Sequence, residues 1–273
     1  MEHSGMGRDP GRLREEMNST PLVNILIPIY KLPLSEYDRI SFNQVYKVLG
    51  DYSLTVIKPS SLDLKTITDE YPRVETVSFP DHYFSGIAGY NQLMMSSEFY
   101  GRFLDSDYLL IYQLDAYVFR DELLQWCEKG YDYIGAPWLK KRIYQYPPLS
   151  WWVDFQYKKE KRSGNPSKYG LHNKIGNGGF SLRKVKSHYE ATLRYREVIE
   201  DFLSHRMHLY NEDVFWATQV SEFTYPDVSE ALLFSFDKYP WYSYKLTKRQ
   251  LPFGCHGWYK RKMKKFWKPI IGF

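Results

Sequence analysis

Short apolar runs alternate with amphipathic segments in the first part of the chain, and this alternation limits the possible folds more than any other feature. Residues 23–29 are nearly all apolar, which is typical of a strand buried on both faces of a parallel sheet. Similar runs predict strands at residues 54–57, 74–78 and 108–114. Helical patterns lie between them, at residues 35–49, 62–70 and 87–103. This order predicts βαβ units with right-handed crossovers.

The second part of the chain has a less regular pattern. We expect helices at residues 123–128, 185–203 and 212–220, and strands at residues 131–134, 178–183 and 232–236. Residues 139–175 show no period, and loops of that length within a domain are commonly lids or binding loops. Residues 251–258 are expected to form a glycine-containing turn. The fold class predicted from the whole pattern is α/β, with a mostly parallel sheet flanked by helices in a single domain.

Length and composition set the domain boundaries and the expected surroundings. A chain of 273 residues can bury one substantial core, which we place at residues 21–258. Residues 1–20 are polar and are expected to form a disordered leader. The chain has no run of about 18 apolar residues, so no membrane span is expected. Two cysteines form no disulfide framework, which fits a reducing compartment and a cytoplasmic location.

The net charge of +5 is unevenly distributed. Residues 258–268 are basic with aromatic residues at each end, and residues 259–273 are expected to form a C-terminal tail. Such a stretch can lie on an anionic membrane surface, which would make the protein membrane-peripheral. A solvated basic tail is an equally good interpretation.

The strongest candidate for chemistry is Asp115, at the end of the most apolar predicted strand. Ligands of open parallel sheets bind outside the carboxyl ends of the strands, where Tyr30 and Lys31 are also expected. A divalent cation that bridges two phosphates needs oxygen ligands such as this carboxylate. The structural alternative is a helix cap or a hydrogen bond at the strand end.

Glycines precede the strand expected at residues 178–183. Gly176, Gly178 and Gly179 would allow a ligand to approach the backbone closely, although a β-turn explains them equally well. The spacing matches neither a dinucleotide-binding fingerprint nor a phosphate-binding P-loop.

Two further motifs carry ionisable groups. Glu212 and Asp213 precede an apolar helical turn, so they either cap this helix or supply a general base for an acceptor hydroxyl. His256 is flanked by glycine and could bind a metal as a neutral imidazole. Its spacing from Cys255 excludes a zinc pair, and a structural role for the histidine remains an alternative.

Taken together and in this order, the motifs resemble the GT-A superfamily of glycosyltransferases. The resemblance is closest to a family of bacterial and other proteins known only as a domain of unknown function. It covers roughly residues 22–258 and rests on five segments: YQLDAYVF at 112–119, GYDYIGAPW at 130–138, GNGGFSLR at 176–183, NED at 211–213 and LPFGCH at 251–256. The resemblance implies a GT-A-like fold, with a nucleotide-binding half at about residues 21–120 and an acceptor half at about residues 121–258.

The resemblance also implies roles for individual residues. Asp115 corresponds to the Asp-x-Asp metal motif, but either Gln113 replaces the first aspartate or Tyr117 replaces the second, so only one carboxylate remains and His256 is expected to complete a manganese or magnesium site. Asp213 is the expected base, with Glu212 as the alternate. The expected donor-binding residues are Tyr30, Lys31, Asn91, Gln113, Asp115, Gly178, Gly179 and Arg183.

The activity implied is transfer of a sugar, with inversion, from a nucleotide-diphosphate donor to a glycan or lipid-linked acceptor. UDP-sugars are the default donor, bacterial surface polysaccharides are one class of product, and no nucleic-acid partner is expected. Two alternatives were weighed. A sugar-nucleotide nucleotidyltransferase would need a basic glycine-rich loop after the first strand, where the chain has Pro28 to Lys31. A non-catalytic member of the same fold would bind a nucleotide or glycan without turnover.

Overall fold

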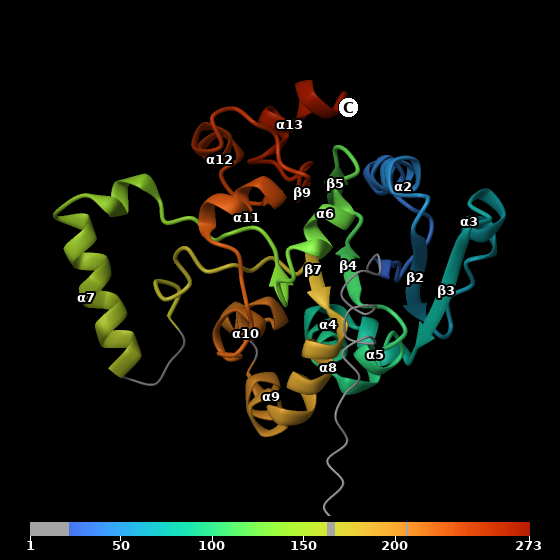
Figure 1. Ribbon diagram of the computed structural model, residues 1–273, viewed down its shortest axis with the longest axis horizontal. Coiled ribbons are helices and arrows are strands. Elements are labelled where there is room, and N and C mark those ends of the chain that lie inside the picture. Colours follow the sequence, from blue (N-terminus) through green and yellow to red (C-terminus); the bar gives the residue numbers. More distant parts are fainter. Residues whose placement is uncertain (1–21, 163–166, 206) are drawn as a thin grey trace, which may run out of the picture.

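Six strands form the central sheet in the order β3-β2-β1-β4-β7-β6 (Figure 1). The computed structural model describes residues 22–162, 167–205 and 207–273, so the predicted leader at residues 1–20 lies outside the described residues. The strands are β1 (Val23–Pro28), β2 (Ser53–Pro59), β3 (Val74–Phe79), β4 (Tyr108–Tyr112), β6 (Tyr133–Ile134) and β7 (Phe180–Lys184). The predicted α/β single domain with a mostly parallel sheet is confirmed.

The strand directions determine which chain segments meet at the edge of the sheet. β1 pairs in parallel with both β2 and β4, so the strand order reverses between β1 and β4. β7 runs antiparallel to β4, with Tyr112 opposite Phe180. The carboxyl ends of β1 and β4 therefore lie at the same edge as the amino end of β7. This is the position where open α/β sheets bind ligands.

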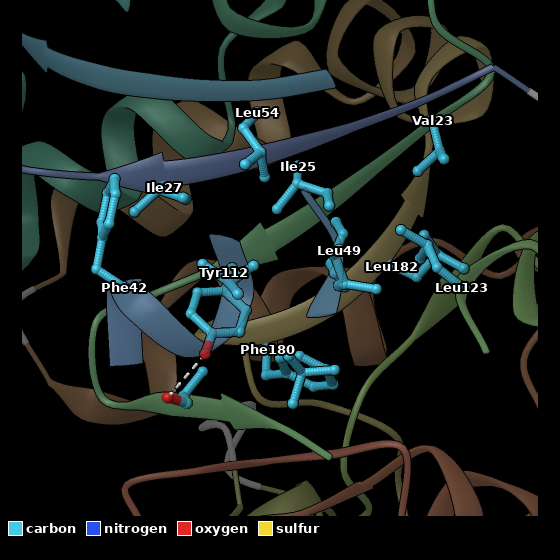
Figure 2. Packing of buried hydrophobic residues seen from close by; sticks show 14 of the residues in the cluster. Val23, Ile25, Ile27, Phe42, Leu49, Leu54, Tyr112, Leu123, Phe180 and Leu182 are labelled. Atoms are coloured by element: carbon cyan, nitrogen blue, oxygen red, sulfur yellow. Dashed lines mark hydrogen bonds between the residues drawn. The ribbon is translucent and has the colours of Figure 1, made fainter. Parts of the chain in front are cut away.

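Helices cover both faces of the sheet, and alternate residues of β1 separate two cores. Ile25 and Ile27 join a cluster with Phe42 and Leu49 on one face, as Figure 2 shows. Leu26 belongs to a second cluster on the other face. The helices before β6 are α2 (Glu36–Val48), α3 (Lys65–Glu70), η1 (Asp81–Phe84), α4 (Gly86–Met94), α5 (Ser97–Gly101) and α6 (Leu123–Glu128). Those between β7 and β8 are α8 (Val185–Arg194), α9 (Arg196–Ser204), η3 (His208–Tyr210), α10 (Glu212–Thr218) and α11 (Val228–Phe234).

The start of α2 follows the sequence rule for a helix N-terminus. Ser35 accepts a hydrogen bond from the Asp38 N–H, and the Asp38 carboxylate accepts one from the Ser35 N–H in return. This capping box satisfies backbone donors that have no partner within the helix. Ser35 is therefore the N-cap of α2, at the first residue of the helix expected at residues 35–49.

A second, three-stranded sheet lies beside the carboxyl edge of the central sheet. Its order is β5-β9-β8, with β5 (Ala116–Val118), β8 (Ser235–Phe236) and β9 (Gly254–His256). Helices α12 (Pro240–Leu246) and α13 (Lys264–Ile271) adjoin it in the upper part of Figure 1. The indole of Trp258 donates to the Ala116 carbonyl at 3.0 Å.

The segment expected as a C-terminal tail contains the helix α13, which buries one side against the domain and leaves its basic residues largely exposed. Trp258 and Trp267, the aromatic residues near the ends of the basic stretch, are fully buried, and Phe266 is nearly so. They form one cluster with Phe236. These rings cannot insert into a membrane while they remain in this core. No helix in the described ranges is long and apolar enough to cross a membrane.

Several sequence expectations differ from the structure. Residues 139–175 were expected to lack regular structure, but they contain η2 (Arg142–Gln145) and the 14-residue helix α7 (Leu149–Arg162). The single helices expected at residues 87–103 and 185–203 are each divided in two, because Ser96 caps a new helix and Tyr195 ends α8. The strand expected at residues 232–236 is mostly the end of α11, since a short apolar run suits either element.

His188 gives the fold a defined pH dependence. It is fully buried, and burial lowers its pKa to about 3, so it is neutral in the folded protein. Between about pH 3 and its ordinary value of 6.5, the unfolded chain binds one more proton at this site than the folded chain. We expect this residue to reduce the free energy of unfolding by about 1.4 kcal/mol per pH unit as the pH falls through that window.

The variant His188→Asn tests this expectation by urea unfolding at a series of pH values. The asparagine amide can replace the contact between the His188 ring and the Lys184 carbonyl, which lie 2.9 Å apart, but it does not titrate. The variant should have a lower free energy of unfolding near neutral pH. In acid, its free energy of unfolding should fall less steeply with pH than that of the wild type, by about the 1.4 kcal/mol per pH unit that one proton contributes. An unchanged slope would show that His188 is protonated in the folded state.

Candidate functional site

A cavity lies at the carboxyl edge of the sheet, where the strand order reverses. Its volume is about 560 Å³, within the range of small-ligand pockets. Tyr30 and Lys31 follow β1, and Gln113 and Asp115 follow β4. The start of α2, helix α4, the loop before β7, the start of α10, and the end of β9 with the segment after it form the rest of the wall. The predicted site residues that line the cavity are Tyr30, Lys31, Asn91, Gln113, Asp115, Gly178, Gly179, Glu212, Asp213 and His256.

Asp115 and His256 are brought together by strand pairing. Ala116 of β5 pairs with His256 of β9, and the Gly257 N–H donates to the Asp115 carbonyl at 2.7 Å. As a result, Oδ1 of Asp115 lies 2.9 Å from Nε2 of His256. Nζ of Lys260 lies 2.8 Å from the other carboxylate oxygen. One carboxylate is therefore shared by two basic groups at the wall of the cavity.

The charges in this group influence each other's protonation. Burial opposes ionisation of Asp115, but His256 and Lys260 outweigh it and hold the pKa of Asp115 well below its usual range. Burial likewise opposes protonation of His256, but Asp115 and Asp237 outweigh it and raise the pKa of His256 to about 9. Asp237 contributes because its Oδ1 lies 3.5 Å from Nδ1 of His256.

The glycines before β7 let the backbone approach these side chains. A Cβ atom at Gly179 would overlap the His256 ring and approach Oε1 of Gln113 to 2.8 Å. A Cβ atom at Gly178 would overlap the Glu212 carboxylate. Any larger residue would therefore displace a polar group of the site. Close packing against Glu212, His256 and Gln113 therefore explains why these positions are glycine.

Glu212 and Arg183 form a buried ion pair behind the cavity wall. Nη2 of Arg183 lies 3.0 Å from both carboxylate oxygens of Glu212, and the Arg183 side chain is fully buried. Nη1 of Arg183 also donates to the Tyr100 hydroxyl at 3.0 Å. Burial raises the pKa of Glu212 to about 7, although Arg183 opposes the rise. Arg183 was expected to contact the donor, but it does not line the cavity.

Asn91 fixes the start of α10. Its side-chain oxygen accepts from the Glu212 N–H at 3.1 Å, and its amide donates to the Asn211 side chain at 3.2 Å. The amide thus satisfies one of the free donors at the helix N-terminus. Asn91 lines the cavity as expected, and the contacts assign it a structural part in positioning Glu212 and Asp213.

Asp213 remains open to the cavity. It is only partly buried, whereas Glu212 is almost completely buried. Burial raises the pKa of Asp213, while the backbone N–H groups of Gly178 and Val214 favour its charged form. A carboxylate with these properties can accept a proton from a hydroxyl bound in the cavity.

Sequence reasoning missed Asp237 and Lys260. Asp237 directly follows β8, so the rule applied to Asp115 would have found it if the short strand had been given more weight. Lys260 was included in the expected tail. Asn177 was also missed: its side chain is buried at the cavity wall, and its amide nitrogen has no hydrogen-bond partner within the described residues.

Solved structures share this architecture. The chain superposes on apo mouse xyloside xylosyltransferase 1 with a TM-score of 0.53 and 12% identity, covering 86% of this chain and 97% of the other. For the galactosyltransferase LgtC, in complex with donor and acceptor sugar analogues, the TM-score is 0.55, the identity 12% and the coverage 85% and 86%. For the glycosyltransferase GlyE of Streptococcus pneumoniae, they are 0.51, 10%, and 93% and 61%. The fold is therefore the GT-A-like fold of glycosyltransferases.

The sequence profile of the protein family of unknown function DUF5672 matches residues 73–256. The chain belongs to this family. The matched region begins before β3 and ends at His256, so it includes most of the cavity wall. A search of curated protein sequences finds no match.

The buried ion pair can be tested by removing Arg183. Arg183→Met should lower the free energy of unfolding by about 3–5 kcal/mol, because the Glu212 carboxylate would be buried without a partner. Loss of the arginine should raise the pKa of Glu212 further, so the folded state holds its proton to higher pH. The destabilisation should therefore grow as the pH rises above about 7.

Urea unfolding of three variants would check this. The double variant Arg183→Met/Glu212→Gln should be more stable than Arg183→Met alone, since no charge is then buried. Arg194→Met, which breaks an exposed ion pair with Glu222, should cost less than about 1 kcal/mol. Equal losses for the two single variants would contradict the interpretation.

Proposed function

We propose that this protein is a glycosyltransferase that moves a sugar from a nucleoside diphosphate to an acceptor hydroxyl. The observation that carries the proposal is the meeting of three groups in one cavity at the strand-order switch. Asp115 and His256 form the first group, Lys260 supplies a positive charge, and Asp213 supplies an accessible carboxylate. A sugar–diphosphate bond needs charge stabilisation on the diphosphate side and a base on the acceptor side.

The donor is proposed to span the cavity from the end of β1 to the loop before β7. Tyr30 is largely exposed at the cavity mouth, where its ring can stack on a nucleobase, and Lys31 lies beside it. Gln113, Gly178 and Gly179 line the same cavity, and they are proposed to contact the sugar and the phosphates. UDP is the proposed nucleotide by resemblance.

The side chains of Asp115 and His256 fit a divalent cation. Their facing oxygen and nitrogen are 2.9 Å apart, yet neither His256 ring nitrogen makes a well-aligned hydrogen bond within the described part of the chain. Two donor atoms side by side in this way can share one cation. Among the described residues, no group of three or more His, Cys, Asp or Glu side chains is arranged so that it could hold a metal ion by itself, so phosphate oxygens would supply other ligands.

We propose manganese or magnesium as the metal, held by Asp115 and His256. When bound, it would supply Lewis-acid stabilisation of the negative charge on the departing diphosphate. Ligation requires the neutral imidazole, so binding would release the His256 proton. Lys260 adds a fixed positive charge beside the same carboxylate.

The proposed reaction is a single displacement with inversion. Asp213 takes the proton from the acceptor hydroxyl as that oxygen forms a bond to the anomeric carbon. The bond from the anomeric carbon to the diphosphate oxygen breaks, and its electrons leave with the diphosphate. Glu212 is the less suitable base, because its carboxylate is buried and bound to Arg183.

The acceptor is proposed to be a carbohydrate or a lipid-linked glycan, as in polysaccharide synthesis. The alternative function is binding of a nucleotide or glycan without turnover, which the single carboxylate of the metal pair favours. Nucleotide binding without turnover of any donor would establish that alternative.

Nucleotide binding can be measured by thermal shift. The wild-type protein should show a higher melting temperature with UDP and manganese than with either alone, because ligands stabilise the state that binds them. Asp115→Asn should lose most of the manganese-dependent part. Asp105→Asn, an exposed aspartate outside the cavity lining, is the matched control and should behave as wild type. If no nucleoside diphosphate stabilises the protein, with or without metal, the proposed donor class is wrong.

The base can be tested by release of UDP from a panel of UDP-sugars. Asp213→Asn should lower the turnover rate by about a hundredfold or more, which is the usual contribution of general base catalysis. Its UDP-dependent thermal shift should remain, because the carboxylate acts on the acceptor side. Unchanged turnover in Asp213→Asn would rule out this residue as the base.

A further inference from the structure

The helix α7 projects from the body of the protein and is exposed on most of its surface. Figure 1 shows it at the left, away from the two sheets. One side packs on the chain: Val153 is buried, and the rings of Trp152 and Tyr169 are in edge contact with centroids 5.7 Å apart. The aromatic residues Trp151 and Phe155 are 68% and 63% exposed. Large exposed aromatic residues on a helix indicate a contact surface.

Helical geometry places the exposed aromatic and basic residues of α7 on one face. Trp151 and Phe155 are one turn apart, and Lys158 and Arg162 continue the same face at intervals of three and four residues. All four are exposed. The face is therefore apolar in its first half and basic in its second half. This combination is typical of helices that lie in the interface of a bilayer.

Charge identifies the chemistry of the partner. Residues 139–162, which we name the α7 arm, contain seven Lys or Arg and two Asp or Glu, a net charge of +5. This equals the net charge of the whole chain, so the remaining residues are neutral in sum. The basic residues of the arm are Lys140, Lys141, Arg142, Lys158, Lys159, Lys161 and Arg162. A concentrated positive charge beside exposed tryptophan suits an anionic lipid surface.

Other aromatic surface near the arm is consistent with a flat partner. The side chain of Gln145 donates to the Tyr242 hydroxyl at 3.2 Å, so η2 of the arm contacts α12. Trp241 of α12 is 62% exposed. By contrast, Trp258, Phe266 and Trp267 of the basic C-terminal stretch are buried, which leaves the arm as the better surface for membrane contact.

We infer that the α7 arm docks this protein on an anionic membrane surface, with Trp151 and Phe155 inserted at the headgroup level and the lysines paired with lipid phosphates. This inference is independent of the proposed transferase activity, because none of these residues lines the cavity. It concerns peripheral contact only.

Vesicle co-sedimentation of the full-length protein tests the inference. The wild type should bind vesicles of phosphatidylcholine mixed with phosphatidylserine much more strongly than vesicles of phosphatidylcholine alone, and added salt should weaken the binding. Trp151→Ser/Phe155→Ser should weaken binding about tenfold, and Lys158→Glu/Lys159→Glu at least as much. These residues are exposed, so the variants should keep the thermal stability of the wild type.

Two matched controls separate the arm from general surface properties. Leu104→Ser/Leu193→Ser removes two exposed apolar side chains elsewhere, and Lys47→Glu/Lys186→Glu makes the same charge change elsewhere. Both should bind vesicles almost as the wild type does. Equal losses in the controls, equal binding to neutral vesicles, or no vesicle binding would overturn the inference. So would self-association in sedimentation velocity that Trp151→Ser/Phe155→Ser abolishes, because the face would then bind a second copy.

Discussion

The parallel pairing of β1 with both β2 and β4 determines where this protein can bind a ligand. Because β2 pairs with one side of β1 and β4 with the other, the carboxyl ends of β1 and β4 lie side by side where the strand order reverses, which is where open α/β sheets have their binding crevice. Asp115 stands at that crevice. The antiparallel β7 then brings a glycine loop to the same edge, so a cavity forms from segments that are far apart in the sequence.

Burial distinguishes the ionisable groups that support this cavity from those that are accessible for chemistry. Glu212 and Asp213 are adjacent in the chain and both line the cavity, but the Glu212 carboxylate is buried and bound to Arg183, whereas Asp213 is only partly buried. The ion pair behind the wall holds the start of α10, and Asn91 holds its backbone. The neighbouring carboxylate is thereby kept in place while remaining accessible.

The sequence allowed the sheet to be predicted because its central strands are buried on both faces and contain almost only apolar residues. Candidate residues at strand ends could be found by the same logic, as Asp115 shows. The helix α7 could not be predicted in this way. Its aromatic residues Trp151 and Phe155 lie on the solvent side, so apolar residues do not recur on one face only, as they do in an amphipathic helix. The burial of Arg183 could not be predicted from the sequence either, because the residues that surround it come from elements distant in the chain. Long-range packing, which no local pattern records, decided these cases.

The chain segment that contains the α7 arm begins and ends at the same place. Pro137 and Ile175 form a β-bridge, the Trp138 N–H donates to the Lys174 carbonyl at 2.9 Å, and a Cβ atom at Gly176 would overlap the Trp138 ring. The two chain ends of the excursion therefore meet just before the glycine loop of the cavity. An insertion joined in this way behaves as an exchangeable module. Under the membrane docking proposed above, a different arm would direct the protein to a different surface, while the cavity would keep its shape.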